Sequence, residues 1–273
     1  SLGTGTLNLT GKTGGSVTVN GLVTAGALTT IGNAYNITLN GGGTITAAVS
    51  FLNTGSLTID ASGFTFTGGA SKITGAKSFD GTISSTNAAL NFGTAGAITL
   101  AGSTTFSSGT GAITLFDVTA LNFNLVLQGS GADVLAAVSL GTGTLNLTGK
   151  TGGSVTVNGA LSAGALTTVG NAYNITLNGG GTVTAAVSFL NTGSLTIDPS
   201  GFTFTGGASK VTGAKSFAGT ISSTNAALNF GTAGAITLAG NTTFSSGTGA
   251  ITLFDVTALN FNLVLQGSGA DVL

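Results

Sequence analysis

Residues 55–69 read GSLTIDASGFTFTGG, two short runs of alternating apolar and polar residues separated by a turn. Leu57, Ile59, Phe64 and Phe66 share one side of these runs, and threonines lie between them. This period of two, rich in β-branched and aromatic residues, indicates half-buried β-strands. Runs of the same kind recur at 6–10, 16–20, 36–40, 97–100, 112–115 and 121–127, the last being the longest. Because no segment has sustained helical periodicity, the sequence predicts an all-β protein.

The second half of the chain repeats the first. Residues 1–21 return unchanged as residues 139–159, and about nine of the roughly 135 comparable positions differ. Self-similarity over a long, fixed period is the signature of a repeat architecture. We therefore expect two near-identical modules, 1–138 and 139–273, which continue directly into one another. The repeat and the absence of an initiating Met lead us to expect a piece of a longer tandem array.

The composition is unusual for a globular protein. The chain has 48 Gly, 1 Pro and no Cys or His, and charged residues make up 5%, against about 25% in ordinary domains. Its 41% apolar residues and its net charge of −1 argue against disorder. The same net charge gives no reason to expect binding to nucleic acid or to anionic lipid. No run approaches the roughly 20 apolar residues of a spanning helix, so membrane insertion is not expected.

Three all-β architectures fit alternating strands: a sandwich, a barrel and a solenoid. The first module divides into about seven consecutive segments of roughly 17 to 21 residues, a length typical of β-solenoid coils. Single Gly or Asn residues between the strands suit the corners of such coils, because Gly allows positive φ without a side-chain clash. Scarce charge also fits, because like charges stacked about 4.8 Å apart on successive coils would repel.

We therefore predict a parallel β-helix, or β-solenoid, of about seven coils per 138-residue repeat. A right-handed winding is expected from general chain chirality. Tandem immunoglobulin-type sandwiches are the main rival, but they normally contain a core Trp and domains of about 100 residues. A transmembrane barrel has less support, because only Tyr35 and Tyr173 are available for an aromatic girdle.

Three strings carry a family resemblance: GSLTIDASGFTFTGG at 55–69, ITLNGGGTITA at 37–47 and GAITLAGS at 96–103. They resemble the repeat regions of filamentous-haemagglutinin-type exoproteins and related autotransporter adhesins. The resemblance covers the whole chain in pattern and composition. It implies a right-handed parallel β-helix on a bacterial surface, secreted through the outer membrane, that serves as a stalk or adhesive fibre. It implies no catalytic residues, because the shafts of those families have none.

The inventory of chemically active side chains is small. Acid–base chemistry would depend on Asp60, Asp80, Asp117, Asp133, Lys12, Lys72, Lys77, Tyr35 and their second-module partners. Asp60 and Asp80 lie about one coil apart and would be neighbours, but Ala218 replaces Asp80 in the second module. The Ser residues lack a His base, which excludes a triad. We expect these charged residues to be solvated at coil corners, and we predict no enzyme activity and no cofactor.

One segment resembles a metal-binding motif. Residues 128–136, QGSGADVLA, match the calcium-binding nonapeptide G-G-x-G-x-D-x-U-x except at the first position. Asp133 is therefore the candidate calcium ligand, and Asp271 takes its place in the shortened second copy at 266–273. Calcium rolls use the nonapeptide in tandem, and this motif is solitary. We expect a Gly-rich corner with an Asx turn instead of a metal site.

The chain has 16 Phe, eight in each module. Those in phase with the buried residues are expected to stack inside the solenoid: Phe64, Phe66, Phe92, Phe106 and Phe123. The better candidates for exposure are Phe51, Phe79 and Phe116.

These observations favour a structural role as a repeat of a long extracellular bacterial surface filament or adhesin stalk. The expected partners are neighbouring repeats of the same chain and identical chains in a fibre. Scarce surface charge would let such fibres approach closely and bundle into a biofilm matrix or sheath. The alternative function is an adhesin in which one face binds a glycan or a host surface. Neither nucleic acid nor a membrane is an expected partner.

Overall fold

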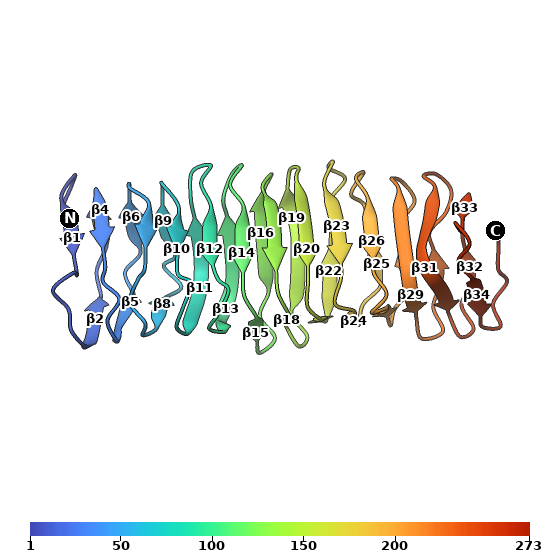
Figure 1. Cartoon of the computed structure of the whole chain (residues 1–273), viewed down its shortest axis with the longest axis horizontal. Coiled ribbons are helices and arrows are strands. Elements are labelled where there is room, and N and C mark those ends of the chain that lie inside the picture. Colours follow the sequence, from blue (N-terminus) through green and yellow to red (C-terminus); the bar gives the residue numbers. More distant parts are fainter.

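The computed structural model describes residues 1–273 as a single rod of stacked β-strands with no helix (Figure 1). The pairings between strands are parallel and run along the rod axis, from each turn to the next. Val17, Ile37 and Leu57, for example, are aligned at steps of 20 residues. The protein is therefore an all-β parallel solenoid of about 12 turns. No helix in it is long and apolar enough to cross a membrane.

The rod has three faces, which we number in the order in which the chain first visits them. Face 1 contains β1 (Thr6–Asn8), β4 (Ala27–Thr29), β7 (Val49–Ser50), β10 (Ala70–Ser71), β12 (Leu90–Phe92), β14 (Ile113–Leu115), β17 (Ala132–Leu135), β20 (Ser154–Val157), β23 (Asn174–Leu177), β26 (Leu195–Ile197) and β33 (Val256–Thr257). Face 2 contains β2 (Gly15–Val19), β5 (Tyr35–Leu39), β8 (Leu57–Ile59), β15 (Val118–Ala120), β18 (Val138–Ser139), β21 (Leu161–Ala163), β24 (Gly181–Val183), β27 (Phe202–Phe204) and β34 (Leu263–Gln266).

Face 3 contains β3 (Val23–Ala25), β6 (Gly43–Ile45), β9 (Phe64–Phe66), β16 (Leu125–Gly129), β19 (Thr144–Lys150), β22 (Ala165–Thr167), β25 (Val187–Ser188), β28 (Ala208–Ser209), β30 (Leu228–Asn229) and β32 (Ile251–Thr252). Four longer strands bend around a corner and serve two faces. β11 (Lys77–Ser84) and β13 (Ile98–Ser107) pass from face 2 to face 3, and β29 (Lys215–Ser222) and β31 (Ile236–Ser245) pass from face 1 to face 2.

The 138-residue repeat does not contain a whole number of turns. Eighteen strands begin within the first module, and β11 and β13 each serve two faces, which makes 20 strand segments. Because three segments make one turn, a module has six and two-thirds turns, close to the seven expected.

The second module is consequently turned by one face relative to the first. β1 lies on face 1, whereas the copy of its sequence in β19 pairs with β22 on face 3. The copies of β2 and β3 are β20 on face 1 and β21 on face 2. The same residues therefore meet different neighbouring faces in the two modules, while the pairing continues without a break across residues 138 and 139.

The apolar side chains of all three faces meet in one continuous core of 58 buried residues that runs the length of the rod. Phe64 and Phe66 stack with their ring centroids 4.7 Å apart, and Phe79 packs edge to face with Phe92 at 4.8 Å. Aromatic pairs in these geometries add to the stabilisation from burial. The alternation read from residues 55–69 thus places its apolar side inward, as predicted.

Corners are tight enough to require glycine. Gly43 has φ +145, and a Cβ at this position would overlap the carbonyl oxygen of Val23 on the preceding turn. Gly181 occupies the same place in the second module and meets Leu161 in the same way. The many glycines therefore serve close backbone approach between turns as well as turning.

The predictions for three Phe residues and one strand are wrong. Phe51 and Phe79 are buried, whereas Phe123 is 36% exposed. The run at 121–127 is the longest alternating run in the sequence, yet β16 begins only at Leu125, and β13 and β31 are the longest strands at 10 residues. The cause is Asn122, whose φ of 70 makes a corner inside the alternating run and turns Phe123 outward.

Candidate functional site

Charged side chains lie inside the rod, where the sequence pattern predicts none. Those with side chains in the core are Lys72, Lys77, Asp133, Lys150, Lys210 and Lys215. The expectation of solvated corner residues is therefore wrong for these six, although Asp60, Asp80, Asp117 and Lys12 are partly exposed. A fully buried charge is costly unless it is paired or hydrogen-bonded, so their partners define the polar chemistry of the interior.

Lys77 occupies a core position on face 2, aligned between Leu57 and Ile98 on the adjacent turns. Its ammonium donates to the carbonyl oxygens of Gly75, Ala95 and Gly96 at 3.1, 2.8 and 2.9 Å. Three carbonyls take all three N–H groups of the ammonium. Backbone carbonyls at the corner therefore take the place of an acidic partner for Lys77.

Lys72 lies near Lys77 and has a smaller set of partners. Its Nζ donates to the carbonyl oxygen of Asn53 at 2.6 Å. Burial lowers the pKa of both lysines to about 8, and the charge of Lys77 contributes to the lower pKa of Lys72. The buried Asn53 side chain donates to the carbonyl oxygen of Tyr35 at 2.9 Å, while its Oδ1 atom has no hydrogen-bond partner.

The second module reproduces this arrangement. Lys210 donates to the carbonyl oxygen of Asn191 at 2.6 Å, and Lys215 donates to those of Gly213, Ala233 and Gly234. Burial lowers the pKa of Lys210 to about 8 and also lowers the pKa of Lys215. Two lysine pairs with matching partners therefore sit on different faces of the same core.

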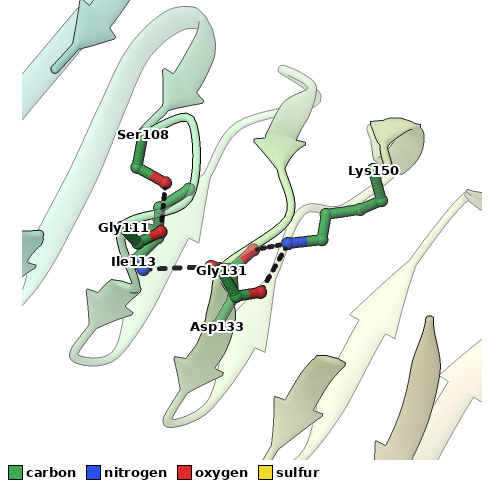
Figure 2. A network of polar contacts seen from close by, with 6 residues as sticks. All are labelled: Ser108, Gly111, Ile113, Gly131, Asp133 and Lys150. Carbon is green, nitrogen blue, oxygen red and sulfur yellow. Dashed lines mark hydrogen bonds and ion pairs between the residues drawn. The ribbon is translucent and has the colours of Figure 1, made fainter. Parts of the chain in front are cut away.

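Asp133 and Lys150 form a buried ion pair at the junction between the modules (Figure 2). The Oδ2 atom of Asp133 lies 2.6 Å from the Nζ atom of Lys150, and both side chains are fully buried. The Oδ1 atom accepts a bond from the backbone N–H of Ile113 at 3.0 Å, and Lys150 also donates to the carbonyl oxygen of Gly131 at 2.9 Å. Burial raises the pKa of Asp133, and the hydrogen bond and charge of Lys150 act against that rise. The pair joins the first module, which supplies the acid, to the second, which supplies the base.

This geometry leaves no opening for calcium at Asp133, because the ammonium of Lys150 stands where a cation would bind. Oxygen ligands from several residues are needed for calcium, and the structure contains no group of three His, Cys, Asp or Glu side chains that would hold a metal ion. Asp271 uses its Oδ1 atom in the same way as Asp133, accepting from the backbone N–H of Ile251 at 2.9 Å.

Asp60 and Asp80 bond within their own corners, whereas Asp117 accepts from the backbone N–H of Ala137 on the following turn at 3.1 Å. Register places Asp80 one turn beyond Asp60, as the spacing predicted. Asp60 accepts from the backbone N–H of Ser62 at 3.0 Å, and Asp80 accepts from that of Gly81 at 2.7 Å. The bond of Asp60 to the residue two positions on is an Asx turn, which stabilises the corner. The two carboxylates therefore have a local structural role.

An apolar ridge runs along the corner between faces 1 and 2 of the first module. It consists of Ile31, Leu52 and Ile73 on three successive turns, which are 36%, 56% and 40% exposed. A hollow of about 330 Å³ lies beside Leu52 and Ile73. In the second module the ridge residues are Val169, Leu190 and Val211. Because that module is turned by one face, they lie at the corner between faces 3 and 1.

One signal in the sequence could have revealed the buried lysines. Lys77 and Phe79 stand 20 residues after Leu57 and Ile59, in the same alternating phase, and the structure aligns these pairs. The ion pair had no comparable signal, because its partners lie 17 residues apart on different faces.

Comparison with known proteins adds no relative to this picture. No protein-family model matches the chain, and neither a curated protein nor a solved structure matches it.

Proposed function

We propose that this chain is a structural shaft: a stiff, right-handed spacer within an extracellular bacterial surface filament or adhesin stalk. The observation that carries the proposal is the uninterrupted pairing from β2 to β34 along face 2, with one core beneath it. A rod in which each turn completes the hydrogen bonding of the next extends in length without needing a second fold.

The chemistry of the side chains supports this role. The buried lysines bind backbone carbonyls or a single acid, and the partly exposed Asp60 and Asp117 accept from backbone N–H groups of the solenoid. Polar groups therefore stabilise the solenoid itself. No side chains converge on a cleft in a way that would bind and transform a substrate. The geometry therefore favours a mechanical role over catalysis.

The apolar ridge supports side-by-side contact between such shafts. Its residues are exposed at a corner, where a neighbouring rod can cover them, and few charges surround them. Bundling of identical chains into a matrix or sheath follows from this surface chemistry.

The shaft proposal is tested by length and location together. Small-angle scattering of the 273-residue chain should give a rod about 58 Å long, and each further 138-residue module should add about 32 Å, at about 4.8 Å per turn. An antibody against residues 121–124, which form an exposed corner, should label intact cells of the source bacterium. A compact scattering profile, or labelling only after the cells are made permeable, would contradict the proposal.

A further inference from the structure

A shallow groove runs along face 1 of the first module, on the side next to the corner between faces 3 and 1. It has a volume of about 300 Å³, and most of the residues that line it are small: Ala48, Ser50, Gly68, Gly69, Ser71 and Ala89. The second module has the same groove on face 3, lined by the copies of these six residues. Because the groove recurs on a different face, the local sequence forms it.

The floor of the groove is bare backbone. A Cβ on Gly68 would overlap the backbone nitrogen of Ala48 on the preceding turn, and a Cβ on Gly206 would overlap that of Ala186 in the same way. Gly69 has φ +92, a conformation that residues with a side chain rarely adopt. No side chain at these positions can fill the groove from within, so the space is open to a side chain of another molecule.

The apolar ridge lies along the other side of the same face. β7 separates Ala48 in the groove from Leu52 on the ridge, and β10 separates Gly68 from Ile73. Groove and ridge therefore lie at the same height on the rod and repeat with the same step of one turn.

Only short, uncharged side chains separate the groove from the ridge. Ser50 and Ser71 point outward between them, and their hydroxyl groups lie 3.3 Å apart. No residue that lines the groove, or the hollow beside the ridge, carries a charge. Face 1 of the first module thus combines an apolar projection with a depression of matching spacing.

The spacing of the groove points to an identical rod as its occupant. The lining residues belong to three successive turns, so an occupant must present apolar side chains about 4.8 Å apart along one line. The ridge of a second copy meets this requirement with Leu52 and Ile73, whose side chains are otherwise exposed to solvent. Covering such side chains removes apolar surface from water, which favours the contact.

We propose that two rods pack face 1 against face 1 through their first modules, with the ridge of each rod in the groove of the other. The rods point in the same direction, so that Leu52 of one rod lies against Ala48 and Gly68 of the second copy. This inference rests on the proposed shaft function, and it identifies the surface that receives the ridge and the relative direction of neighbouring shafts.

The positions of ridge and groove determine that direction. Rotating a rod by a half-turn about an axis parallel to its length exchanges the two sides of face 1, so each ridge meets a groove. A half-turn about an axis across the rod, which would make the two rods antiparallel, brings ridge against ridge and leaves both grooves empty. The parallel contact is isologous, because the same two surfaces of each copy take part.

The second module repeats the contact in another direction. Its groove lies on face 3, and its ridge of Val169, Leu190 and Val211 lies at the corner between faces 3 and 1. Each rod therefore has one neighbour at its first module and a different neighbour at its second. Such contacts extend into an array and do not stop at a pair.

Sedimentation velocity of the 273-residue chain provides the test, with the second module disabled. Ala186→Gln/Leu190→Gln fills the groove and removes the main ridge residue of that module. This background chain should form dimers and nothing larger, whereas the parent should form larger oligomers. Adding Ala48→Lys or Leu52→Asp to the background should weaken dimerisation by about 10-fold or more, because the contact would then bury an unpaired charge.

A mixture and a control make the test specific. An equimolar mixture of the Ala48→Lys and Leu52→Asp chains should restore dimerisation, because the lysine in one groove then meets the aspartate on the other ridge. Antiparallel rods would not bring these two residues together, so the mixture would show no recovery. Ala61→Lys, an exposed alanine at the corner between faces 2 and 3, is the matched control and should dimerise like the background chain.

Several results would overturn the proposal. These are single variants that dimerise as strongly as the background chain, a mixture that dimerises no better than its components, and a control that weakens dimerisation as much as Ala48→Lys. A parent chain that stays monomeric yet scatters as a rod about 58 Å long would refute the contact and leave the shaft proposal standing. Circular dichroism of each variant establishes that loss of association is not loss of folding.

Discussion

The two modules have nearly the same sequence, yet equivalent residues differ in burial where their neighbouring turns differ. Lys72 and Lys210 lie on different faces and still donate to equivalent carbonyl oxygens, those of Asn53 and Asn191, each at 2.6 Å. Lys12 and Lys150, by contrast, share a local sequence, but only Lys150 is fully buried against an acid. Local sequence therefore sets the shape of each corner, and the turn stacked on it sets the electrostatic environment.

The largest difference between copies is expected at the junction. Lys150→Met should lower the free energy of unfolding by about 3–5 kcal/mol, because Asp133 would remain buried without its partner. Lys12→Met, the same substitution in the other copy, should cost less than about 0.5 kcal/mol, because Lys12 has no ion pair and is partly exposed. Denaturant titration measures the unfolding free energy of each variant. Equal losses in the two variants would contradict the difference between Lys150 and Lys12. The double variant Asp133→Leu/Lys150→Met should recover most of the loss.

The buried lysines predict that stability rises with pH between about 8 and 10. The pKa of Lys72 and of Lys210 is about 8 in the folded chain, against 10.5 for an ordinary lysine, so the unfolded chain binds more protons in this range. The unfolding free energy should therefore increase by up to about 1.4 kcal/mol per pH unit for each lysine. Above this range the raised pKa of Tyr173 should make the unfolding free energy fall as the pH rises, because the unfolded chain loses this proton first.

Paired variants test the assignment of that pH dependence. Lys72→Met and Lys210→Met should each reduce the slope of unfolding free energy against pH by a similar amount, because their partners match. Melting temperatures measured between pH 7 and 10 provide the comparison. If the slope of unfolding free energy against pH is unchanged in both variants, the pH dependence of stability comes from groups other than Lys72 and Lys210.

A smaller difference is expected at a corner where the modules differ in sequence. A Cβ on Gly102 would overlap the carboxylate of Asp80, whereas the nearest atom to a Cβ on Gly240 is the Cβ of Ala218 at 3.1 Å. Gly102→Ala should cost about 1–2 kcal/mol, since Asp80 must give up its bond to Gly81, and Gly240→Ala should cost less. Thermal denaturation compares them, and Asp80→Ala should remove most of the penalty of Gly102→Ala.

The smallest effect on folding is expected at the apolar ridge. Leu52→Asn and Leu190→Asn should each change the unfolding free energy by less than about 0.5 kcal/mol, because both side chains are more than half exposed. Lateral association at high concentration, followed by light scattering, should fall in both and fall further in the double variant. If scattering is unchanged, the ridge is not a contact between rods.

Much of the fold follows from the sequence for a definite reason. Alternation at 55–69 and corner glycines spaced about 20 residues apart specify both the strand phase and the length of a turn. The corner at Asn122 could not be read, because the run LNFNLVL alternates through it and nothing but a positive φ interrupts the strand. The prediction for Phe123 fails for the same reason.

The candidate site was less accessible from the sequence. The motif at 128–136 correctly draws attention to Asp133, but a solitary acid can be interpreted only from its own loop. Its partner, Lys150, belongs to the next module and comes close only because a turn of the solenoid intervenes. The buried lysines escape prediction because charge is ordinarily a sign of exposure, although backbone carbonyls at the corners satisfy Lys77 completely.

The remainder of two-thirds of a turn in each module has a consequence for fibre symmetry. Three modules in succession would complete 20 turns, about 96 Å, before a given sequence returned to its starting face. A repeat with a whole number of turns would place every apolar ridge along a single corner and favour flat ribbons. In this repeat, successive modules instead place the ridge on each of the three corners in turn. A longer array therefore presents the same apolar contact in three directions, which suits lateral packing on all sides of the rod.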